Sequence, residues 1–239
     1  MGDAEMILMC ERNIRGGVSY INERHVQLSD YQDCEDTAQD QLLYTDANNL
    51  YSVAQSAPVP CGDFEWCADD TLEQLEADIL NVPVEGEIGY ILEVDLAYPP
   101  ELHESHASMP LAPQQEELTF ADLSPYSQRC LIHLHGESRA RKYKSKKLCS
   151  TLRDKKKYVV HFRNLQTYVR LGMRLTKIHR AFRFNQAPVI RKFIQLCTEK
   201  RKQASTAAEK NVWKLTMNST YGKFIQVINS LITLITSLN

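Results

Sequence analysis

The chain has 239 residues, 43% of them hydrophobic, and its seven cysteines include no CxxC pair, so it can bury a core without a disulfide framework or a cysteine zinc site. Its net charge of −2 conceals an uneven distribution: residues 1–128 hold 26 Asp and Glu against three Lys and Arg, whereas residues 129–239 hold four against 25. Either the two halves neutralise each other, or the basic half faces a polyanion while the acidic half faces metal or solvent.

Apolar runs and turn residues predict a mixture of strands and helices in the first half. Residues 41–46 indicate a short buried strand that ends on a carboxylate. Residues 58–70, rich in Pro, Gly and Asp, predict a loop, and residues 71–80 have the start signal and apolar spacing of a helix. Residues 89–96 alternate as a strand does, and two prolines close it.

The second half begins with a stretch of weak pattern. Residues 99–117 have no apolar period and predict a long exposed loop. A dense basic run over 139–157 precedes a predicted strand at 158–162 and a predicted helix at 165–175. After Pro188 a helical stretch continues towards Tyr221. The pattern therefore predicts a mixed α+β fold.

The ends of the chain carry no targeting signal that we can identify. The start lacks the basic segment of a secretory signal, and the apolar run at 225–238 is interrupted by polar residues and too short to span a bilayer. We expect an intracellular protein, nuclear or cytoplasmic, that is neither secreted nor inserted in a membrane.

The first motif that can carry chemistry is Asp46-Ala-Asn-Asn-Leu-Tyr51. A carboxylate at a strand end, followed by a chain reversal, can hold Mg²⁺ while backbone N–H groups approach phosphates. An Asp that leads a turn is also an ordinary helix cap or turn residue. Alone, the motif leaves both interpretations open.

The second motif is Lys214-Leu-Thr-Met-Asn-Ser-Thr-Tyr221-Gly-Lys223. On a helix, Lys210, Lys214, Asn218 and Tyr221 share one face, where cations can meet triphosphate oxygens and a ring can stack on a base. An ordinary solvated basic face has the same composition. The opposite face is expected to pack inward, with Ala208, Val212, Leu215 and Ser219.

The two motifs together resemble the A and B motifs of family B DNA polymerases, which have Asp-x-Asn-x-Leu-Tyr and, far downstream, Lys-x-x-x-Asn-Ser-x-Tyr-Gly. Ile14-Arg-Gly-Gly17 looks like the glycine motif of the protein-primed members. Residues 152–165 and 175–180 resemble the same region in polymerases of self-synthesising DNA transposons and linear plasmids. The resemblance covers residues 14–224, nearly the whole chain.

The resemblance implies a partial palm and fingers with a basic insertion between them. Residues 1–57 would begin the palm with motif A, and 58–189 would be an insertion, first acidic and then basic. Residues 190–224 would form the fingers helices with motif B, and 225–239 a tail outside the family.

The resemblance also implies a role for individual residues. Asp46 would be the catalytic ligand of Mg²⁺, and Tyr51 would lie under the incoming sugar and exclude a 2′-hydroxyl. Lys214 would bind the triphosphate with help from Lys202 and Lys210. The nascent base pair would be lined by Asn218 and Tyr221, and template or primer DNA would contact Gly16, Gly17, Gly222, Lys155, Lys156 and Lys157.

The basic run itself fits contact with a nucleic-acid backbone, because tyrosine and phenylalanine side chains lie among its cations. A nuclear targeting signal or a solvated loop would have a similar composition. The partners implied by the resemblance are DNA template and primer, deoxynucleoside triphosphates and a terminal priming protein. The implied reaction is protein-primed, template-directed transfer of a deoxynucleotidyl group to a 3′-hydroxyl.

Departures from the family pattern bear on activity. Asn49 and Ser52 stand where many members have Ser and Pro, and no Tyr-x-Asp-Thr-Asp motif follows Glu209. Catalysis by two metal ions needs a second carboxylate, and Asp95 and Glu93 fit a solvated strand face better than that role. We therefore expect the chain alone to be inactive. The alternatives are a non-catalytic DNA- or nucleotide-binding remnant of a transposon or viral polymerase, and an interaction module that retains only the acidic-basic pairing.

Overall fold

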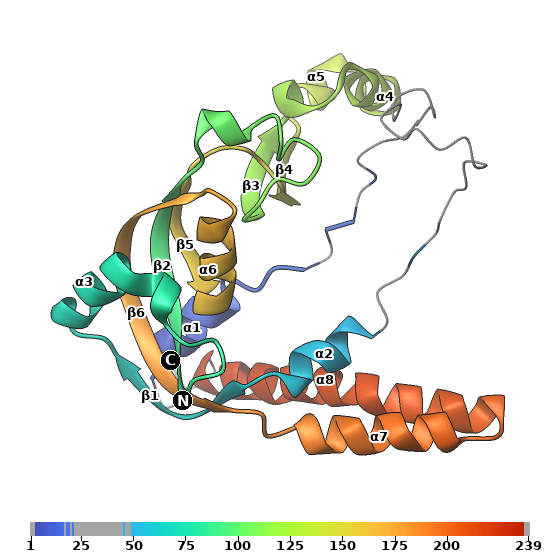
Figure 1. Ribbon diagram of the computed structural model, residues 1–239. Coiled ribbons are helices and arrows are strands. Elements are labelled where there is room, and N and C mark those ends of the chain that lie inside the picture. The colour runs from blue at the N-terminus through green and yellow to red at the C-terminus, as the bar shows by residue number, and fades with distance from the viewer. Residues whose placement is uncertain (1–2, 17, 20, 22–44, 46–48, 237–239) are drawn as a thin grey trace, which may run out of the picture.

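The computed structural model describes residues 3–16, 18, 19, 21, 45 and 49–236. At its centre is an antiparallel sheet of four strands in the order β1-β6-β2-β5 (Figure 1). The longest strand, β6, pairs with both β1 and β2 and so joins the edge strand to the interior of the sheet. The bounds are β1 Val59–Trp66, β2 Ile88–Ala97, β5 Lys155–His161 and β6 Arg174–Ala187.

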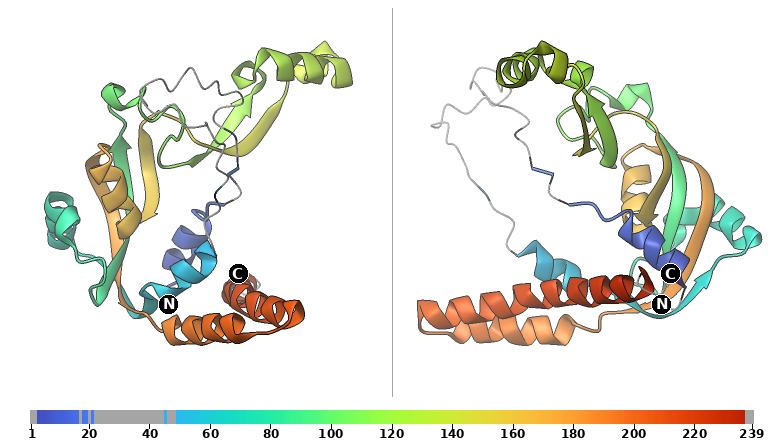
Figure 2. Two further views of the ribbon diagram at one scale, coloured as in Figure 1. Left: turned by 45° about the vertical axis from the view of Figure 1, so that its right-hand side comes forward. Right: turned by 180° about the vertical axis from the view of Figure 1, so that it is seen from behind.

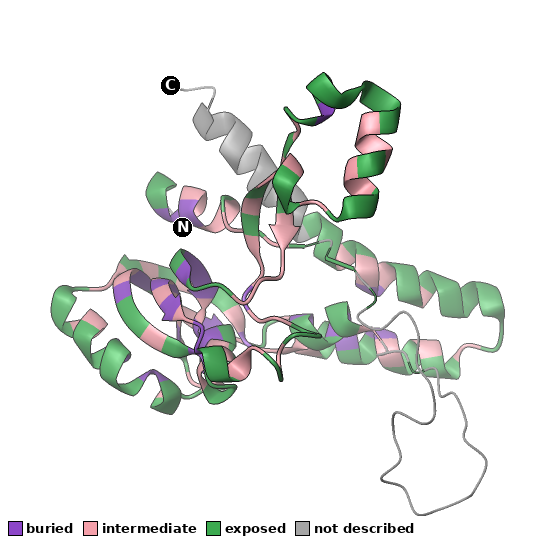
Figure 3. Ribbon diagram, turned by 90° about the horizontal axis from the view of Figure 1, so that it is seen from above, coloured by how far each residue is buried: buried purple, intermediate pink, exposed green. Residues whose placement is uncertain are grey.

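Each face of the sheet is covered by a helix and buries its own apolar cluster. On one face Leu92 packs with Phe162 and Leu165 of α6 (Phe162–Arg170), and α3 (Asp69–Asp78) adds Leu75. On the other face α1 (Ala4–Glu11) packs its methionines against Phe182 and Phe184 of β6. The buried residues gather along these strands in Figure 3. Each fully buried large apolar side chain contributes about 1.5–3 kcal/mol relative to exposure.

A second, two-stranded sheet forms a projection at one end of the central sheet. It consists of β3 (Gln114–Thr119) and β4 (Lys144–Cys149), joined through α4 (Pro125–His135) and α5 (Glu137–Ala140). Gly136 separates the two helices with a φ of 75°, a conformation that glycine adopts without strain. Short 3₁₀ helices, η2 (Ile79–Asn81), η3 (Pro100–Leu102) and η4 (Phe120–Asp122), complete the connections.

The other projection is a helical hairpin of α7 (Arg191–Gln203) and α8 (Ala207–Thr236), with α2 (Leu50–Ser56) lying along it (Figure 1). The hairpin has a small core of Ile194, Cys197 and Met217. A capping box begins α8: Glu209 N–H donates to Thr206 Oγ1 over 3.2 Å, and the Glu209 carboxylate accepts from the backbone N–H of Thr206 over 3.4 Å. Both projections extend to the same side of the sheet in each view of Figure 2.

The mixed α+β class is confirmed, as are the strand at 89–96 and the helix at 71–80, but several expected elements differ. The predicted loop at 58–70 is largely strand β1, because β6 supplies a pairing partner that its own composition does not reveal. The predicted loop at 99–117 contains η3 and the start of β3. The helix expected over 165–175 ends at Arg170, since Gly172 follows with a φ of 99° and β6 then begins.

Candidate nucleotide-binding site

α2, which contains the end of the first motif, contacts the hairpin that carries the second motif. Asn49, in a left-handed conformation with a φ of 52°, donates through Nδ2 to Ser52 Oγ over 2.5 Å and lies 3.8 Å from Met217 Sδ. At the other end of α2, Arg191 Nε donates to the Ser56 carbonyl over 2.8 Å. The two departures from the family pattern, Asn49 and Ser52, are therefore each other's partners and help to fix α2.

The aromatic residues of the two motifs are in contact. The ring centroids of Tyr51 on α2 and Tyr221 on α8 lie 4.7 Å apart with an interplanar angle of 44°. Tyr51 is 55% exposed and Tyr221 44% exposed, so the pair presents ring surface to solvent. The fold thus unites the residues that were predicted to meet an incoming sugar and a nascent base pair.

The face that α8 turns inward differs from the one expected. Val212 and Leu215 were expected to pack, yet they are 57% and 66% exposed. Met217 is buried instead, with Trp213 one turn earlier packed beside it. The error arose because a helix in a two-helix hairpin needs only a narrow apolar stripe, and a Trp and a Met spaced by four residues provide it.

The polar face of α8 lies beside this stripe and remains open. Lys210 and Lys214 are exposed, whereas Asn218 is half-buried. The helix continues through Gly222 to Thr236 without a break, and a Cβ at Gly222 would meet nothing within 4 Å. The structure therefore gives no steric reason for glycine at this position within the chain itself.

Three lysines predicted to bind the triphosphate all lie on the hairpin. Lys202 is in the last turn of α7, and Lys210 and Lys214 are in the first half of α8. Among the ion pairs of the described residues none involves these three side chains. The nearby Glu209 is engaged in capping α8. Their charge is therefore not cancelled by a carboxylate in contact.

Elsewhere the acidic and basic halves pair with each other. All but one of the ion pairs between described residues join an acid from 1–128 to a basic side chain from 129–239, and the exception is Arg141 with Glu137. Arg183 with Glu65 links β6 to β1, and Lys144 with Glu117 links β4 to β3. The antiparallel register places acidic strands beside basic ones, which supports mutual neutralisation as one cause of the uneven charge.

Asp95 and Glu93, the carboxylates considered as substitutes for the missing motif, are both engaged. Asp95 accepts from Lys157 N–H over 2.9 Å and Lys156 Nζ over 3.0 Å, and it pairs with His179 Nε2 at 2.9 Å. Desolvation would raise the pKa of Asp95, but these hydrogen bonds outweigh it and hold the pKa well below its ordinary value. Glu93 is paired with Arg180.

The predicted DNA-contacting lysines have three different environments. Lys155 is 1% exposed and its Nζ donates to Thr151 Oγ1 over 2.8 Å, so its ammonium does not face a nucleic acid in this structure. Lys156 is exposed but paired with Asp95. Lys157 is exposed, with a φ of 48°. The DNA-binding role of the three lysines stays a prediction, and Lys155 would have to leave its buried position to take part in it.

The start of the glycine motif is held on the sheet by Arg15. Its guanidinium lies 3.8 Å from the Tyr158 ring centroid, and Nη1 donates to the Val159 carbonyl over 2.7 Å. Gly16, the next residue, is exposed and would have room for a side chain. Gly17 lies outside the described residues. Within its described residues the motif is anchored by its arginine.

The predicted Mg²⁺ ligand, Asp46, also lies outside the described residues. Within the described part of the chain no group of three or more His, Cys, Asp or Glu side chains is placed to share a metal ion. No helix in that part is both long and apolar enough to cross a membrane. The metal expectation rests on the motif alone.

Residues 28–238 match the family model of DNA polymerase type B, organellar and viral. The chain belongs to this family. Searches of the curated proteins and of the solved structures gave no match. The type B polymerase match runs to residue 238 and so includes the segment from residue 225, which was expected to lie outside the resemblance.

A type B DNA polymerase acts on DNA and nucleotides, which gives the contact of Tyr51 with Tyr221 a functional context. Sequence reasoning missed one feature beside it. Gln55 of α2 is buried at 6% exposure, next to the tyrosine pair in the chain fold. The sequence could have indicated this, because Gln55 comes four residues after Tyr51 and residues at that spacing lie on the same face of a helix.

Proposed function

We propose that this polypeptide forms the nucleotide-binding part of a protein-primed type B DNA polymerase, with α2 in the palm and the α7–α8 hairpin as the fingers. Tyr51 and Tyr221 meet the sugar and base of an incoming deoxynucleotide, and Lys214, with Lys202 and Lys210, binds its triphosphate. The reaction served is template-directed deoxynucleotidyl transfer to a 3′-hydroxyl.

The contact between Tyr51 and Tyr221 is the observation that carries this proposal. Two motifs separated by more than 160 positions have no reason to meet unless the fold requires both at one place. The unpaired lysines of the hairpin add the positive charge that a triphosphate requires. Mg²⁺ bound by Asp46 and the phosphates would neutralise charge that develops on the oxygens during transfer.

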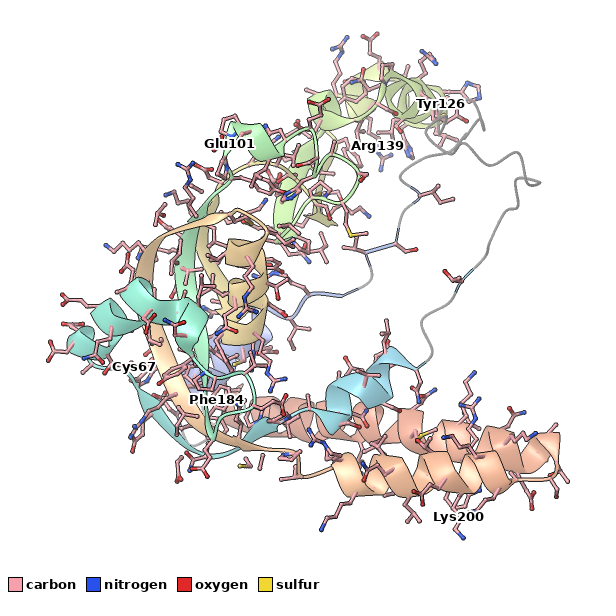
Figure 4. All side chains as sticks on the ribbon, in the orientation of Figure 1. Cys67, Glu101, Tyr126, Arg139, Phe184 and Lys200 are labelled. Carbon is pink, nitrogen blue, oxygen red and sulfur yellow. The ribbon has the colours of Figure 1, made fainter. Side chains whose placement is uncertain are left out.

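Residues 58–189 are proposed to contact the template and a terminal priming protein. Cations without an ion pair also lie on the β3–β4 projection, among them Arg139, Lys142 and Lys146. Figure 4 labels Arg139 on this projection and Lys200 on the hairpin, which extend to the same side of the sheet. A polyanion on that side would meet positive charge from both.

The second candidate is a DNA- and nucleotide-binding protein without turnover. It is favoured by the pairing of Asp95 and Glu93, because neither carboxylate is then free to complete a two-metal site with Asp46. Neither candidate predicts primer extension by the purified chain alone; a gene that continues into a Tyr-x-Asp-Thr-Asp motif would favour the first, whereas nucleotide binding tests what the two candidates share.

The shared function is tested by titrating a deoxynucleoside triphosphate into the purified chain with Mg²⁺ and measuring heat of binding. Lys214→Ala is expected to weaken binding by about 1.5–3 kcal/mol, or roughly 10- to 100-fold, because a charge-assisted hydrogen bond is lost. Lys200→Ala, which removes a cation of the same hairpin, is the matched control and should change the affinity much less. Equal losses in both variants would show a diffuse electrostatic effect and contradict the site.

A further inference from the structure

The turn between α7 and α8 presents a serine hydroxyl at the tip of the hairpin. α7 ends at Gln203 and α8 begins at Ala207, and both Ser205 and Thr206 between them are exposed. The backbone leaves α7 in an extended conformation, with a φ of −61° and a ψ of 129° at Ala204. Figure 1 shows this turn at the end of the hairpin that lies far from the sheet. The serine therefore lies outside both helices and is open to another protein.

The Ser205 hydroxyl differs from the other hydroxyl groups of the hairpin. Among the described side chains, four donate to a backbone carbonyl three or four residues earlier over 2.8–3.0 Å, and these are Thr198, Thr216, Ser219 and Thr220. Thr206 Oγ1 accepts the N–H of Glu209 and caps α8. Ser205 Oγ instead donates over 3.4 Å to the exposed Glu209 carboxylate, so its modification costs the fold little.

Basic side chains lie on both sides of this serine. Lys200, Arg201 and Lys202 are in the last turn of α7, three to five positions before it, and Lys210 completes the first turn of α8. Among the described residues none of these four makes an ion pair. A phosphate on the serine would carry a charge of about −1.5 to −2 at pH 7 and would have uncompensated cations as neighbours.

We propose that Ser205 is a phosphorylation site and that its phosphate excludes the triphosphate of an incoming nucleotide. Three basic residues before an exposed hydroxyl form the kind of charge pattern by which protein kinases select substrates. Such a kinase supplies ATP with Mg²⁺. The Ser205 oxygen attacks the γ-phosphorus, ADP leaves, and the hydroxyl proton passes to the catalytic base of the kinase.

The attached phosphate competes with a nucleotide because it is tethered beside the same lysines. This step rests on the proposed function, in which Lys202 and Lys210 assist in binding the triphosphate. A group tethered over a few residues acts at an effective concentration on the order of millimolar. The Glu209 carboxylate is held by the backbone N–H of Thr206 and repels the phosphate, which favours pairing of the phosphate with the lysines.

The first experiment asks whether the serine is modified. The full 239-residue chain is incubated with ATP, Mg²⁺ and a Ser/Thr kinase that selects a basic residue three positions before the acceptor. Peptide mass spectrometry then locates the phosphate. Ser205 should be modified in most molecules, and the Ser205→Ala variant should carry no phosphate on this turn. If Ser205 stays unmodified, or if the phosphate is on Thr206, the assignment is wrong.

The second experiment measures the effect on nucleotide binding by calorimetry with thymidine triphosphate and Mg²⁺. Phosphoserine is installed by genetic encoding at Ser205 or, as the matched control, at the exposed Ser105, which lies outside the hairpin. The phosphate at 205 should weaken binding by at least about tenfold, as the loss of one hydrogen bond to a charged group does. The phosphate at 105 should change the affinity less than about twofold. Equal affinities, or equal losses at both positions, would overturn the proposal.

The pairing of the phosphate with the lysines has a readout that needs no nucleotide. In ³¹P NMR the second pKa of phosphoserine, ordinarily about 6, should be lowered at 205, because nearby cations favour the dianion. Lys202→Ala together with Lys210→Ala should raise this pKa again. No change in that variant would refute the pairing. If the unmodified chain binds no thymidine triphosphate, the nucleotide-site assignment fails, while the modification and its pairing are still decided by mass spectrometry and NMR.

Discussion

Replacing Asp95 with Asn should destabilise the sheet, because one carboxylate connects three of its strands. From β2, Asp95 accepts from Lys157 N–H over 2.9 Å and from Lys156 Nζ over 3.0 Å, both on β5. It also contacts His179 of β6 at 2.9 Å. Asn has the same shape but only one acceptor oxygen, and an NH₂ group in the place of Oδ2 would face the Lys156 ammonium, which also donates.

The expected magnitude follows from these contacts. If the Asn oxygen takes the place of Oδ1, it keeps the contacts with Lys157 N–H and His179 Nε2 but without the charge of the carboxylate, and the contact with Lys156 on Oδ2 is lost. Lys156 is 70% exposed, and exposed ion pairs are worth about 0–1 kcal/mol. The two contacts of Oδ1 become hydrogen bonds to a neutral oxygen, which weakens them together by about 1–2 kcal/mol. The sum is about 2 kcal/mol, which lowers the melting temperature of a protein of this size by about 4–8 °C.

The effect should depend on pH in a defined direction. Because the pKa of Asp95 is lower in the folded chain than in the unfolded chain, its ionised form stabilises the fold above the unfolded value near 3.8. That stabilisation is lost as the pH falls through the folded value. The gap in melting temperature between Asp95→Asn and the unmodified chain should therefore narrow below about pH 4.

Circular dichroism melts of both chains from pH 3 to pH 7 would measure this gap. Glu104→Gln is the matched control, since the Glu104 side chain is exposed and makes no ion pair with the described residues. It should change the melting temperature by less than about 2 °C. A gap that is absent at pH 7, or one that does not narrow between pH 4 and pH 3, would refute the assigned role of the carboxylate.

Three further outcomes are expected. The affinity for DNA should fall as the salt concentration rises: log K should decrease with log salt by about 0.9 per neutralised phosphate for duplex DNA and about 0.7 for a single strand. A salt titration in which the affinity does not change would contradict phosphate contact. The purified chain should not extend a primer with Mg²⁺ or Mn²⁺, and extension that disappears in Asp46→Ala would show that a second carboxylate takes part. Met217→Ala should cost about 2–5 kcal/mol in urea unfolding, whereas the exposed Val212→Ala should cost less than about 0.5 kcal/mol; similar losses would contradict the observed inward face.

The sequence predicted the structure best where the residues of a segment are enough to determine its conformation. The alternation in residues 89–96 predicted β2, and the two motifs singled out Tyr51 and Tyr221, whose rings are in contact in the fold. It failed where a partner decides the structure: β1 contains Pro and Gly and is a strand because β6 pairs with it. Gln55 could not be predicted, because an unpaired amide is recognised only when the walls around it are known.

The pairing of the strands accounts for much of the uneven distribution of charge along the chain. Antiparallel pairing places β1 and β2, which carry acids, beside β5 and β6, which carry bases, so the sheet neutralises itself. The basic side chains left without an ion pair, among the described residues, include those of the hairpin from Lys192 to Lys214. Because an attractive field acts where charge is not compensated, we expect a phosphate to be attracted more strongly to the hairpin than to the paired side chains of the sheet. The hairpin is also where Tyr51 and Tyr221 meet, so charge and aromatic surface converge on one end of the molecule.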